Sequence, residues 1–512
     1  MFRLETKVKI PFLWGKTSFK KNFWSQVNLI VGPNGSGKTL LAEDLARQFK
    51  EAGYPVTFLR SDRTEQENLF SILKDNNYIR EKIEKVLSAM FGKSIQFEKQ
   101  ADGSFIPMVT NKARNVEYNL KEGECHGLKE IITLLVALYS SKSGCLIFDE
   151  PELHLHPQFQ LFFMNEIRKV VNKNPKRIFF LITHSPFFID LRFPEDLIGV
   201  IVCHINRIPT HIDSLSKDDE MLFRRFLPRF NTYHKQFFFS DNQIFVEGYT
   251  DQQIFSNLLS LIETSYNTAG TGIIDVGGKD ELGVFFKVCS LLGTEGRIIS
   301  DLDALFQGKL RDVVCADSRP ALWLEKQHEK QFPFYRSLFS LSVAKRGPTL
   351  TELVNRLDQF LIDIGNAICD VSVDVPENLD LFFSKVKNLY QKYENVEYLD
   401  TFKAVVLQGI LKLSDSLGNY LPLPLASKLP LVKNLVALIF AAVEAARVYI
   451  LPRGCIEHYY TRNKVQYMPI SGKDKLFHVE REYMNSASIS KVKKEYAELI
   501  YILEKSCSGK NI

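Results

Sequence analysis

Short apolar runs alternate with amphipathic stretches along the first half of the chain. "VNLIV" (Val27 to Val31), "CLIF" (Cys145 to Phe148) and "FFLI" (Phe179 to Ile182) are too short for buried helices and are typical of buried strands. Between them, apolar residues recur at helical spacing, for example Leu128, Ile131, Ile132, Leu135 and Leu138. The pattern predicts an α/β fold.

The second half repeats this pattern and then changes. The runs "IFV" (Ile244 to Val246), "GIID" (Gly272 to Asp275) and "RIIS" (Arg297 to Ser300) predict three more strands, and Thr250-x-x-Gln253 predicts a capping box that opens a helix. From about Phe306 to Val448 the periodicity is helical, which favours a helical insertion, and "VYIL" then returns to a strand.

Composition adds limits on the class of protein. The 512 residues suffice for about two to four domains, and a formal net charge of +5 is close to neutral, so it permits a nucleic-acid partner without arguing for one. The eight cysteines include no C-x-x-C pair, which favours reduced thiols. The N-terminus has no signal-peptide core, and "NLVALIFAAV" is too short to span a bilayer, so we expect a cytoplasmic protein without a membrane partner.

The first chemical motif is a phosphate-binding loop. Gly32-x-x-x-x-Gly37-Lys38-Thr39 follows a strand and opens a helix, which is the context that the P-loop pattern requires. Its backbone N–H groups converge on phosphate, Lys38 would hold the β- and γ-phosphates of ATP, and Thr39 would ligate Mg²⁺. The expected nucleotide-binding residues of the loop are Gly32, Asn34, Gly35, Gly37, Lys38 and Thr39.

Two further strand ends supply groups for ATP hydrolysis. Asp149 and Glu150 follow "CLIF", where the first carboxylate would reach Mg²⁺ and the second would polarise the attacking water. His184 follows the next strand and is interpreted as a γ-phosphate sensor, although a lone histidine is usually structural.

A second set of carboxylates lies far downstream. "GRIISDLDAL" reads as a strand that ends in Asp301 and Asp303, whose side chains would share one face and raise each other's proton affinity unless a cation neutralises them. Glu247-Gly248 ends an earlier strand, where α/β sheets place their ligands. Asp251 has two interpretations, a complement to the helix dipole or an acid for a metal. Together these acids favour Mg²⁺ or Mn²⁺.

The first half resembles ABC-type ATPase heads of the SMC and OLD (overcome lysogenization defect) families, most closely at "DEPELHLHP" (Asp149 to Pro157). The resemblance places His154 and His156 in a D-loop rather than in a metal site, and it implies a face-to-face homodimer or higher oligomer. Gly123 and Glu124 match the signature segment that contacts the opposite nucleotide. The usual signature serine is absent, with Lys121 or Glu122 in its place, which puts trans-activation in doubt.

The second half resembles the TOPRIM domain of topoisomerases, primases and OLD nucleases. That resemblance implies metal binding by Glu247, Asp301 and Asp303, with Asp251 and, from "LPRGCIE", Glu457 as additional acids. A lysine often completes such sites, and Lys473 and Lys475 are the candidates. The implied domains are an ATPase over residues 1–235, TOPRIM segments over 236–312 and 448–512, and the helical insertion over 313–447.

The resemblance implies an ATP-binding, metal-dependent endonuclease of anti-phage defence, with Glu150, His184, Glu247, Asp301 and Asp303 as catalytic residues and DNA as the favoured substrate. Two alternatives stay open: an ATP-driven sensor or scaffold that binds nucleic acid or a partner protein without cutting, and a nuclease that cuts RNA. The sequence shows no basic stripe or aromatic platform that separates DNA from RNA.

Overall fold

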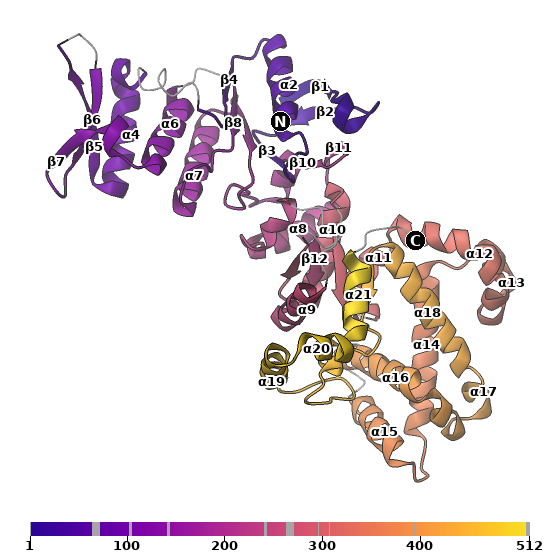
Figure 1. Ribbon diagram of the computed structural model, residues 1–512. Helices are drawn as coiled ribbons and strands as arrows, with labels where there is room; N and C mark the ends of the chain where they lie inside the picture. The colour runs from indigo at the N-terminus through magenta and orange to yellow at the C-terminus, as the bar shows by residue number, and fades with distance from the viewer. Residues whose placement is uncertain are drawn as a thin grey trace. The chain divides into compact units, whose positions relative to one another are not determined.

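The computed structural model in Figure 1 describes residues 2–63, 72–101, 105–140, 144–239, 243–262, 271–294, 296–306, 308–392 and 396–507. The chain forms two compact units. The first comprises Met1–Asp241 with Leu291–Thr294, and the second comprises Asn242–Ser290 with Glu295–Ile512.

A six-stranded sheet in the order β11-β10-β3-β9-β8-β4 is the centre of the first unit. Its strands are β3 (Val27–Val31), β4 (Val56–Leu59), β8 (Cys145–Asp149), β9 (Ile178–Ile182), β10 (Val200–His204) and β11 (Arg207–His211). All neighbours are parallel except β10 and β11. The strands expected to precede the P-loop, Asp149 and His184 are therefore adjacent, and their carboxyl ends meet at one edge.

Helices cover this sheet, and smaller elements flank it. The helices of the unit are α1 (Pro11–Trp14), α2 (Lys38–Glu51), α4 (Asn77–Phe91), α5 (Leu120–Gly123), α6 (His126–Ser140), α7 (Pro157–Lys173) and α8 (Lys217–Phe226), with 3₁₀ helices η1 (Pro194–Gly199), η2 (Leu227–Arg229) and η3 (His234–Phe239). β1 (Phe2–Val8) pairs with β2 (Phe19–Trp24), and β5 (Lys93–Lys99), β6 (Phe105–Asn111) and β7 (Val116–Asn119) form an antiparallel sheet. Helix α2 buries Leu41, Leu45 and Phe49 against the large sheet.

The second unit is built on a four-stranded parallel sheet in the order β13-β12-β14-β15. Its strands are β12 (Gln243–Val246), β13 (Gly272–Asp275), β14 (Arg297–Ser300) and β15 (Val448–Ile450). The helices that belong with this sheet are α9 (Tyr249–Leu261), α10 (Lys279–Leu292), α19 (Lys473–Ser486), α20 (Ile489–Glu495) and α21 (Ala497–Cys507), with 3₁₀ helices η4 (Leu302–Leu305) and η6 (Ile456–Tyr459).

The described residues between η4 and β15 form only helices and the loops that join them, as the helical periodicity predicts. They are α11 (Lys309–Cys315), α12 (Ser318–Leu338), α13 (Leu341–Arg346), α14 (Leu350–Cys369), α15 (Glu377–Tyr390), α16 (Val396–Leu417), η5 (Gly418–Tyr420), α17 (Leu423–Ala426) and α18 (Leu429–Ala445). Within the described chain, one helical stretch, Leu423–Ala445, is long and apolar enough to span a membrane. Its helix α18 packs against α12, α14 and β15, as a core helix does.

Two local expectations are wrong. Helix α9 begins at Tyr249 rather than after Thr250, because Gly248 is its N-cap and its backbone N–H donates to Asp251 Oδ2 at 3.1 Å. Strand β14 ends at Ser300, so Asp301 and Asp303 are not on a strand. Asp301 caps η4 and Asp303 lies inside it, because the Leu302 N–H donates to the Gly454 carbonyl at 2.7 Å and turns the chain.

Candidate nucleotide and metal sites

The phosphate loop has the backbone that its glycines predict. Gly32, Gly35 and Gly37 all have positive φ, and a Cβ on Gly32 would lie 2.2 Å from the Cys203 carbonyl oxygen, which no side chain tolerates. Lys38 is buried and folds back on the loop, where Nζ donates to the carbonyls of Gly32 (3.2 Å) and Pro33 (2.9 Å). Burial lowers the pKa of Lys38. Incoming phosphates would offer this ammonium stronger acceptors than two carbonyls.

Thr39 and Asp149 lie together across the sheet edge. Thr39 Oγ1 donates to Asp149 Oδ2 at 3.3 Å, so the two expected Mg²⁺ ligands face each other. Burial and then the neighbouring Glu150 raise the pKa of Asp149 to about 6. A buried carboxylate that is costly to ionise is a good ligand for a hard cation.

Glu150 and His184 meet at the same edge. Glu150 has a φ of 46°, and its carboxylate is 4.0 Å from His184 Nε2. Burial, followed by Lys38, lowers the pKa of His184, so the ring is neutral near pH 7. Glu152 holds the histidine loop, because it accepts from the His184 N–H (2.6 Å) and from the Thr183 hydroxyl (2.9 Å).

Arg63 is a contributor that the sequence analysis missed. Its buried guanidinium donates to the carbonyls of Asp149 (3.0 Å) and Glu150 (2.9 Å) and pairs with Glu130 at 2.6 Å. Arg63 therefore fixes the backbone turn that aims Glu150. No local pattern marks it, because its partners are 67 to 87 residues away.

The signature segment has an unexpected arrangement. Gly123 ends the short helix α5, and the Glu124 carboxylate is buried against Lys93 Nζ (2.5 Å) and the Tyr118 hydroxyl. In this conformation Glu124 does not point to solvent, so its contact with an opposing nucleotide stays a prediction. The side chain of Lys121 lies outside the described residues. His156 caps α7, and the His154 ring lies 5.3 Å from that of His126.

The second sheet gathers the downstream acids. Glu247 follows β12 and Asp301 follows β14, and these strands are adjacent and parallel, so their carboxyl ends meet. Burial, Asp303 and Asp251 raise the pKa of Glu247 to about 7, and burial and Glu457 raise the pKa of Asp251 to about 7. The pKa of Asp301 is raised well above its usual value by burial, Glu247, Asp251 and Asp303. The fold therefore brings all five predicted acids into one electrostatically coupled cluster. Asp251 accepts from the Gly248 N–H at the start of α9 and lies near the other acids, and its role as an acid for a metal stays a prediction.

The donors of this cluster fit a divalent cation. Glu247 Oε2, Asp303 Oδ1 and Glu457 Oε2 are buried and accept no hydrogen bond. Buried carboxylate oxygens left without donors are a large cost that a hard cation removes. Among the described residues, no group of three or more His, Cys, Asp or Glu side chains has the arrangement that holds a metal ion.

Two lysines hold the acids instead. Lys279 Nζ donates to Asp303 Oδ2 at 3.0 Å, and Lys473 Nζ lies 3.1 Å from Glu457 Oε1. Burial by itself lowers the pKa of both lysines. The nearby carboxylates outweigh burial, so the pKa of Lys279 beside Asp303 and that of Lys473 beside Glu457 are both raised. Of the two candidate lysines, Lys473 is the one paired with the cluster. Lys279 was missed, although its place directly after Gly277-Gly278 at the sheet edge was a usable signal.

Glu457 owes its position to the helical insertion. Gln408 of α16 is 1% exposed, and its Nε2 donates to the Arg453 carbonyl at 2.6 Å and lies 3.3 Å from His458 Nε2. Its Oε1 accepts from the Met468 N–H at 3.2 Å. Burial, followed by Lys412, lowers the pKa of His458 to about 4, so this ring is neutral. The insertion thus supports the segment that carries Glu457.

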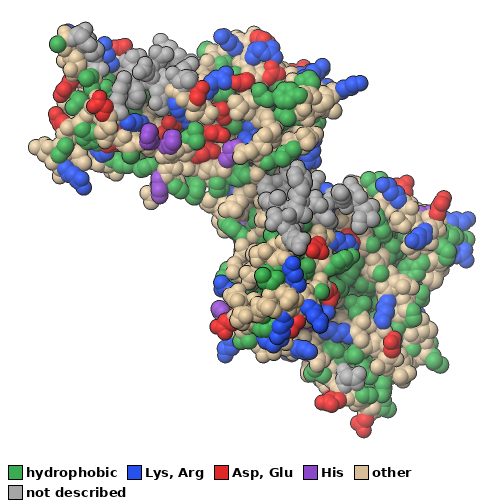
Figure 2. Space-filling view, in the orientation of Figure 1, with side chains coloured by type: hydrophobic (Ala, Val, Ile, Leu, Met, Phe, Trp, Pro, Cys, Tyr) green, Lys and Arg blue, Asp and Glu red, His purple; other side chains and the backbone are tan. Residues whose placement is uncertain are grey.

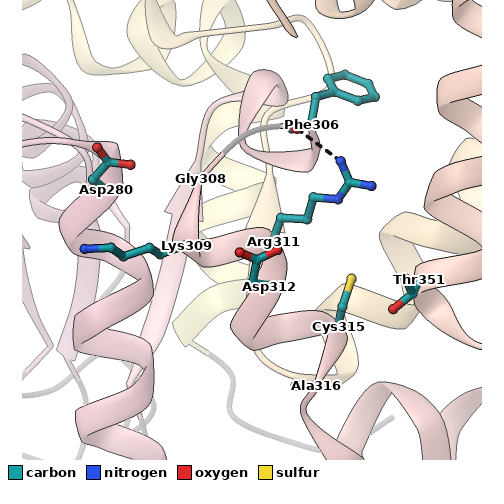
Figure 3. A pocket seen from close by; sticks show the side chains of 9 residues that line it. All are labelled: Asp280, Phe306, Gly308, Lys309, Arg311, Asp312, Cys315, Ala316 and Thr351. Carbon is teal, nitrogen blue, oxygen red and sulfur yellow. Dashed lines mark hydrogen bonds between the residues drawn. The ribbon is translucent and has the colours of Figure 1, made fainter. Parts of the chain in front are cut away.

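A cavity of about 540 Å³ lies beside the cluster, bordered by α10, α11 and α14 (Figure 3). Asp280 follows Lys279, and Arg311 donates to the Phe306 carbonyl at 3.1 Å. None of the five acids lines it. The lining residues are Asp280, Phe306, Gly308, Lys309, Arg311, Asp312, Cys315, Ala316 and Thr351.

Comparison with known proteins gives the same two modules. Residues 63–189 match an AAA ATPase domain, and residues 238–303 match the TOPRIM domain of overcoming-lysogenization-defect-like proteins. The chain is 28% identical to the OLD nuclease of Thermus scotoductus over 166 residues, which cover 32% of this chain and 31% of that protein. It is 25% identical to the endonuclease GajA of Bacillus cereus over 189 residues, which cover 32% of this chain and 27% of that protein.

The match thus spans less than a third of the length of either relative. A solved structure, that of Stu0660 of Streptococcus thermophilus, covers 45% of this chain and 86% of its own at 13% identity, with a TM-score of 0.26.

Proposed function

The chain joins an ATPase domain to an OLD-like TOPRIM domain. We propose that the protein is an ATP-gated, divalent-metal-dependent endonuclease. The observation that carries this proposal is the cluster of Glu247, Asp251, Asp301, Asp303 and Glu457, with three buried carboxylate oxygens that accept no hydrogen bond. Five neighbouring acids at one sheet edge do not stabilise the unit, because each makes ionisation of the others less favourable. This unfavourable free energy is evidence that the acids serve a function.

The roles of the side chains follow from their charges. Glu247, Asp301 and Asp303 would hold Mg²⁺ or Mn²⁺, which when bound supplies an activated water and stabilises the leaving oxygen of a phosphodiester. Lys279 and Lys473 lie against Asp303 and Glu457 of the cluster. Once a cation neutralises those acids, both ammonium groups are available to the non-bridging oxygens of the substrate phosphate.

The ATPase half would control this site. Lys38 and the P-loop bind ATP, Thr39 and Asp149 hold its Mg²⁺, and Glu150 and His184 act on the γ-phosphate. We infer that ATP brings two heads together and so gates cleavage in a homodimer or larger oligomer of the cytoplasm. The favoured substrate is DNA and the favoured setting is anti-phage defence, as the resemblance to OLD nucleases suggests.

One observation favours a second function. Glu124, in the segment expected to reach the opposite nucleotide, is buried against Lys93 and Tyr118. A head whose signature segment is engaged in its own protomer hydrolyses ATP slowly, which suits a sensor or scaffold. The intact acid cluster favours the nuclease, with RNA as the alternative substrate.

The test is cleavage of supercoiled plasmid DNA and of a matched RNA with Mg²⁺ or Mn²⁺, with and without ATP. Wild-type protein is compared with Asp301→Asn, with Lys38→Ala and with Asp312→Asn, which alters an exposed acid outside the cluster. We expect cleavage that Asp301→Asn abolishes and Asp312→Asn preserves, with an ATP response that Lys38→Ala removes. ATP binding without cleavage of either nucleic acid would support the sensor instead.

A further inference from the structure

One segment of the second unit is rich in positive charge. From Arg453 to Glu495, the end of α20, there are nine Lys or Arg residues and five Asp or Glu residues, a surplus of four. Two of the five acids, Glu457 and Glu480, are buried and do not add negative charge to the outer surface of the segment. Figure 2 shows Lys and Arg side chains gathered over the region of α19 and α20. The basic residues are Arg453, Arg462, Lys464, Lys473, Lys475, Arg481, Lys491, Lys493 and Lys494.

The fold holds this segment beside the acid cluster. Helix α19 begins at Lys473, which pairs with Glu457, and both α19 and α20 pack against α9. Helix α9 in turn begins two residues after Glu247. The basic segment therefore reaches the acids at the start of α19, where Lys473 contacts Glu457.

Glu480 makes this arrangement rigid. It is fully buried in α19 and accepts from the backbone N–H groups of Thr461 (2.6 Å) and Arg462 (3.0 Å) and from the Tyr496 hydroxyl. One side chain thus ties the loop after η6 to α19 and to the start of α21, so the basic residues are presented on a fixed scaffold.

Aromatic rings lie among these charges. Tyr249, the first residue of α9, is 55% exposed, and its ring meets the buried Phe477 of α19 edge-on, with centroids 6.0 Å apart. Farther along α19, the Arg462 guanidinium lies 3.9 Å from the Tyr483 ring centroid, and Lys491 Nζ lies 5.3 Å from it. The sequence analysis found no aromatic platform because these residues come from separate parts of the chain.

We propose that Tyr249 and the basic face of α19 and α20 bind an unpaired nucleic-acid strand and lead it into the acid cluster. The proposal rests on the nuclease function and names its substrate class. Lys475 and Lys491 contact backbone phosphates, and Tyr249, supported from below by Phe477, stacks on the base beside the scissile phosphate. An unpaired base exposes its face to such a ring, whereas a duplex keeps its base faces stacked.

The test measures binding apart from cleavage. Full-length protein carrying Asp301→Asn is titrated into a single-stranded oligonucleotide that contains 2-aminopurine, and anisotropy and quenching are recorded. We expect Tyr249→Leu to weaken binding roughly 5- to 150-fold and to abolish quenching, while Tyr249→Phe retains both. Tyr78→Leu, at a 73% exposed tyrosine of the first unit, is the matched control and binds as the parent does.

The phosphate contacts have their own signature. Lys475→Gln with Lys491→Gln lowers the slope of log affinity against log salt by about 1.4 for a single strand. Because both lysines are exposed, the double variant unfolds at the temperature of the parent.

Three results separate this proposal from the nuclease proposal. If the wild-type protein cleaves nucleic acid but Tyr249→Leu binds the single strand as tightly as the parent does, the proposed binding surface is wrong and the nuclease proposal stands. If binding and quenching depend on Tyr249 but no metal ion supports cleavage, the proposed binding surface is supported and the nuclease proposal is wrong. Duplex binding as tight as single-strand binding, unchanged by Tyr249→Leu, overturns the assignment of an unpaired strand.

Discussion

The acid cluster makes the stability of the second unit depend on pH and metal in a direction that the structure fixes. Burial and the neighbouring Asp303 raise the pKa of Glu247 from its ordinary value of 4.5 to about 7 in the folded protein. Because the pKa is raised, the folded state binds the proton more tightly than the unfolded state. Stability is therefore gained as the pH falls through 7 and lost as the pH rises from about 4.5 to 7.

The size of the effect follows from the same shift. Between about pH 6 and pH 8, a carboxyl whose pKa moves from 4.5 to about 7 loses on the order of 1 kcal/mol of stabilisation. For a unit of this size that is about 3 °C in the unfolding midpoint. Asp251, with a pKa of about 7, adds a loss of similar size.

Thermal unfolding with EDTA and with Mg²⁺ at the two pH values measures this directly, and Glu247→Gln removes the titrating group. Comparing variant with parent cancels the titration of residues outside the acid cluster. We expect metal-free Glu247→Gln to gain on the order of 1 kcal/mol of stability relative to the parent between pH 6 and pH 8, and Mg²⁺ to stabilise the parent more at pH 8. An equal pH dependence in parent and variant, or an equal Mg²⁺ effect at both pH values, would refute the reasoning.

Three further outcomes test the rest of the structure. Lys38→Ala removes the ammonium of the P-loop, so a fluorescent ATP analogue should no longer bind, while Lys50→Ala at the exposed end of α2 binds normally. Arg63→Ala frees the backbone of Asp149 and Glu150, so we expect ATP turnover to fall roughly 10- to 100-fold with little change in ATP affinity. Combining Arg63→Ala with Glu130→Gln avoids leaving the buried Glu130 charge unpaired. If the ATP turnover rate and the ATP affinity fall by the same factor, Arg63 has only a structural role. Glu480→Ala removes a fully buried carboxylate that accepts from Thr461, Arg462 and Tyr496 and should cost about 3 kcal/mol in chemical denaturation, against less than about 0.5 kcal/mol for the exposed Glu482→Ala.

The sequence predicts those parts of the protein that depend on neighbouring residues. The strands before Gly32, Asp149, Glu247 and Asp301 are apolar runs that fold as expected, and the P-loop depends on the spacing of its own glycines. The strand placement of Asp301 and Asp303 is wrong because Leu302 bonds to Gly454, which lies some 150 residues away in the chain.

Charged residues whose role depends on tertiary contacts were beyond such patterns. Arg63 and Glu152 lie in loops that look like ordinary surface, and only the fold brings them to the carbonyls and the histidine loop that they contact. Lys473 differs from Lys475 only in opening α19, a boundary that the sequence analysis did not place.

The central claim is that the downstream acids form a metal-dependent nuclease site separate from the ATP site. The most direct measurement is the single-turnover rate of strand cleavage in Mn²⁺ for Glu247→Gln, Asp303→Asn, Lys38→Ala and Asp312→Asn beside the parent, each without ATP. The account predicts losses of roughly 100-fold or more for Glu247→Gln and Asp303→Asn, and unchanged ATP-independent rates for Lys38→Ala and Asp312→Asn. Cleavage that survives both acid substitutions would contradict it.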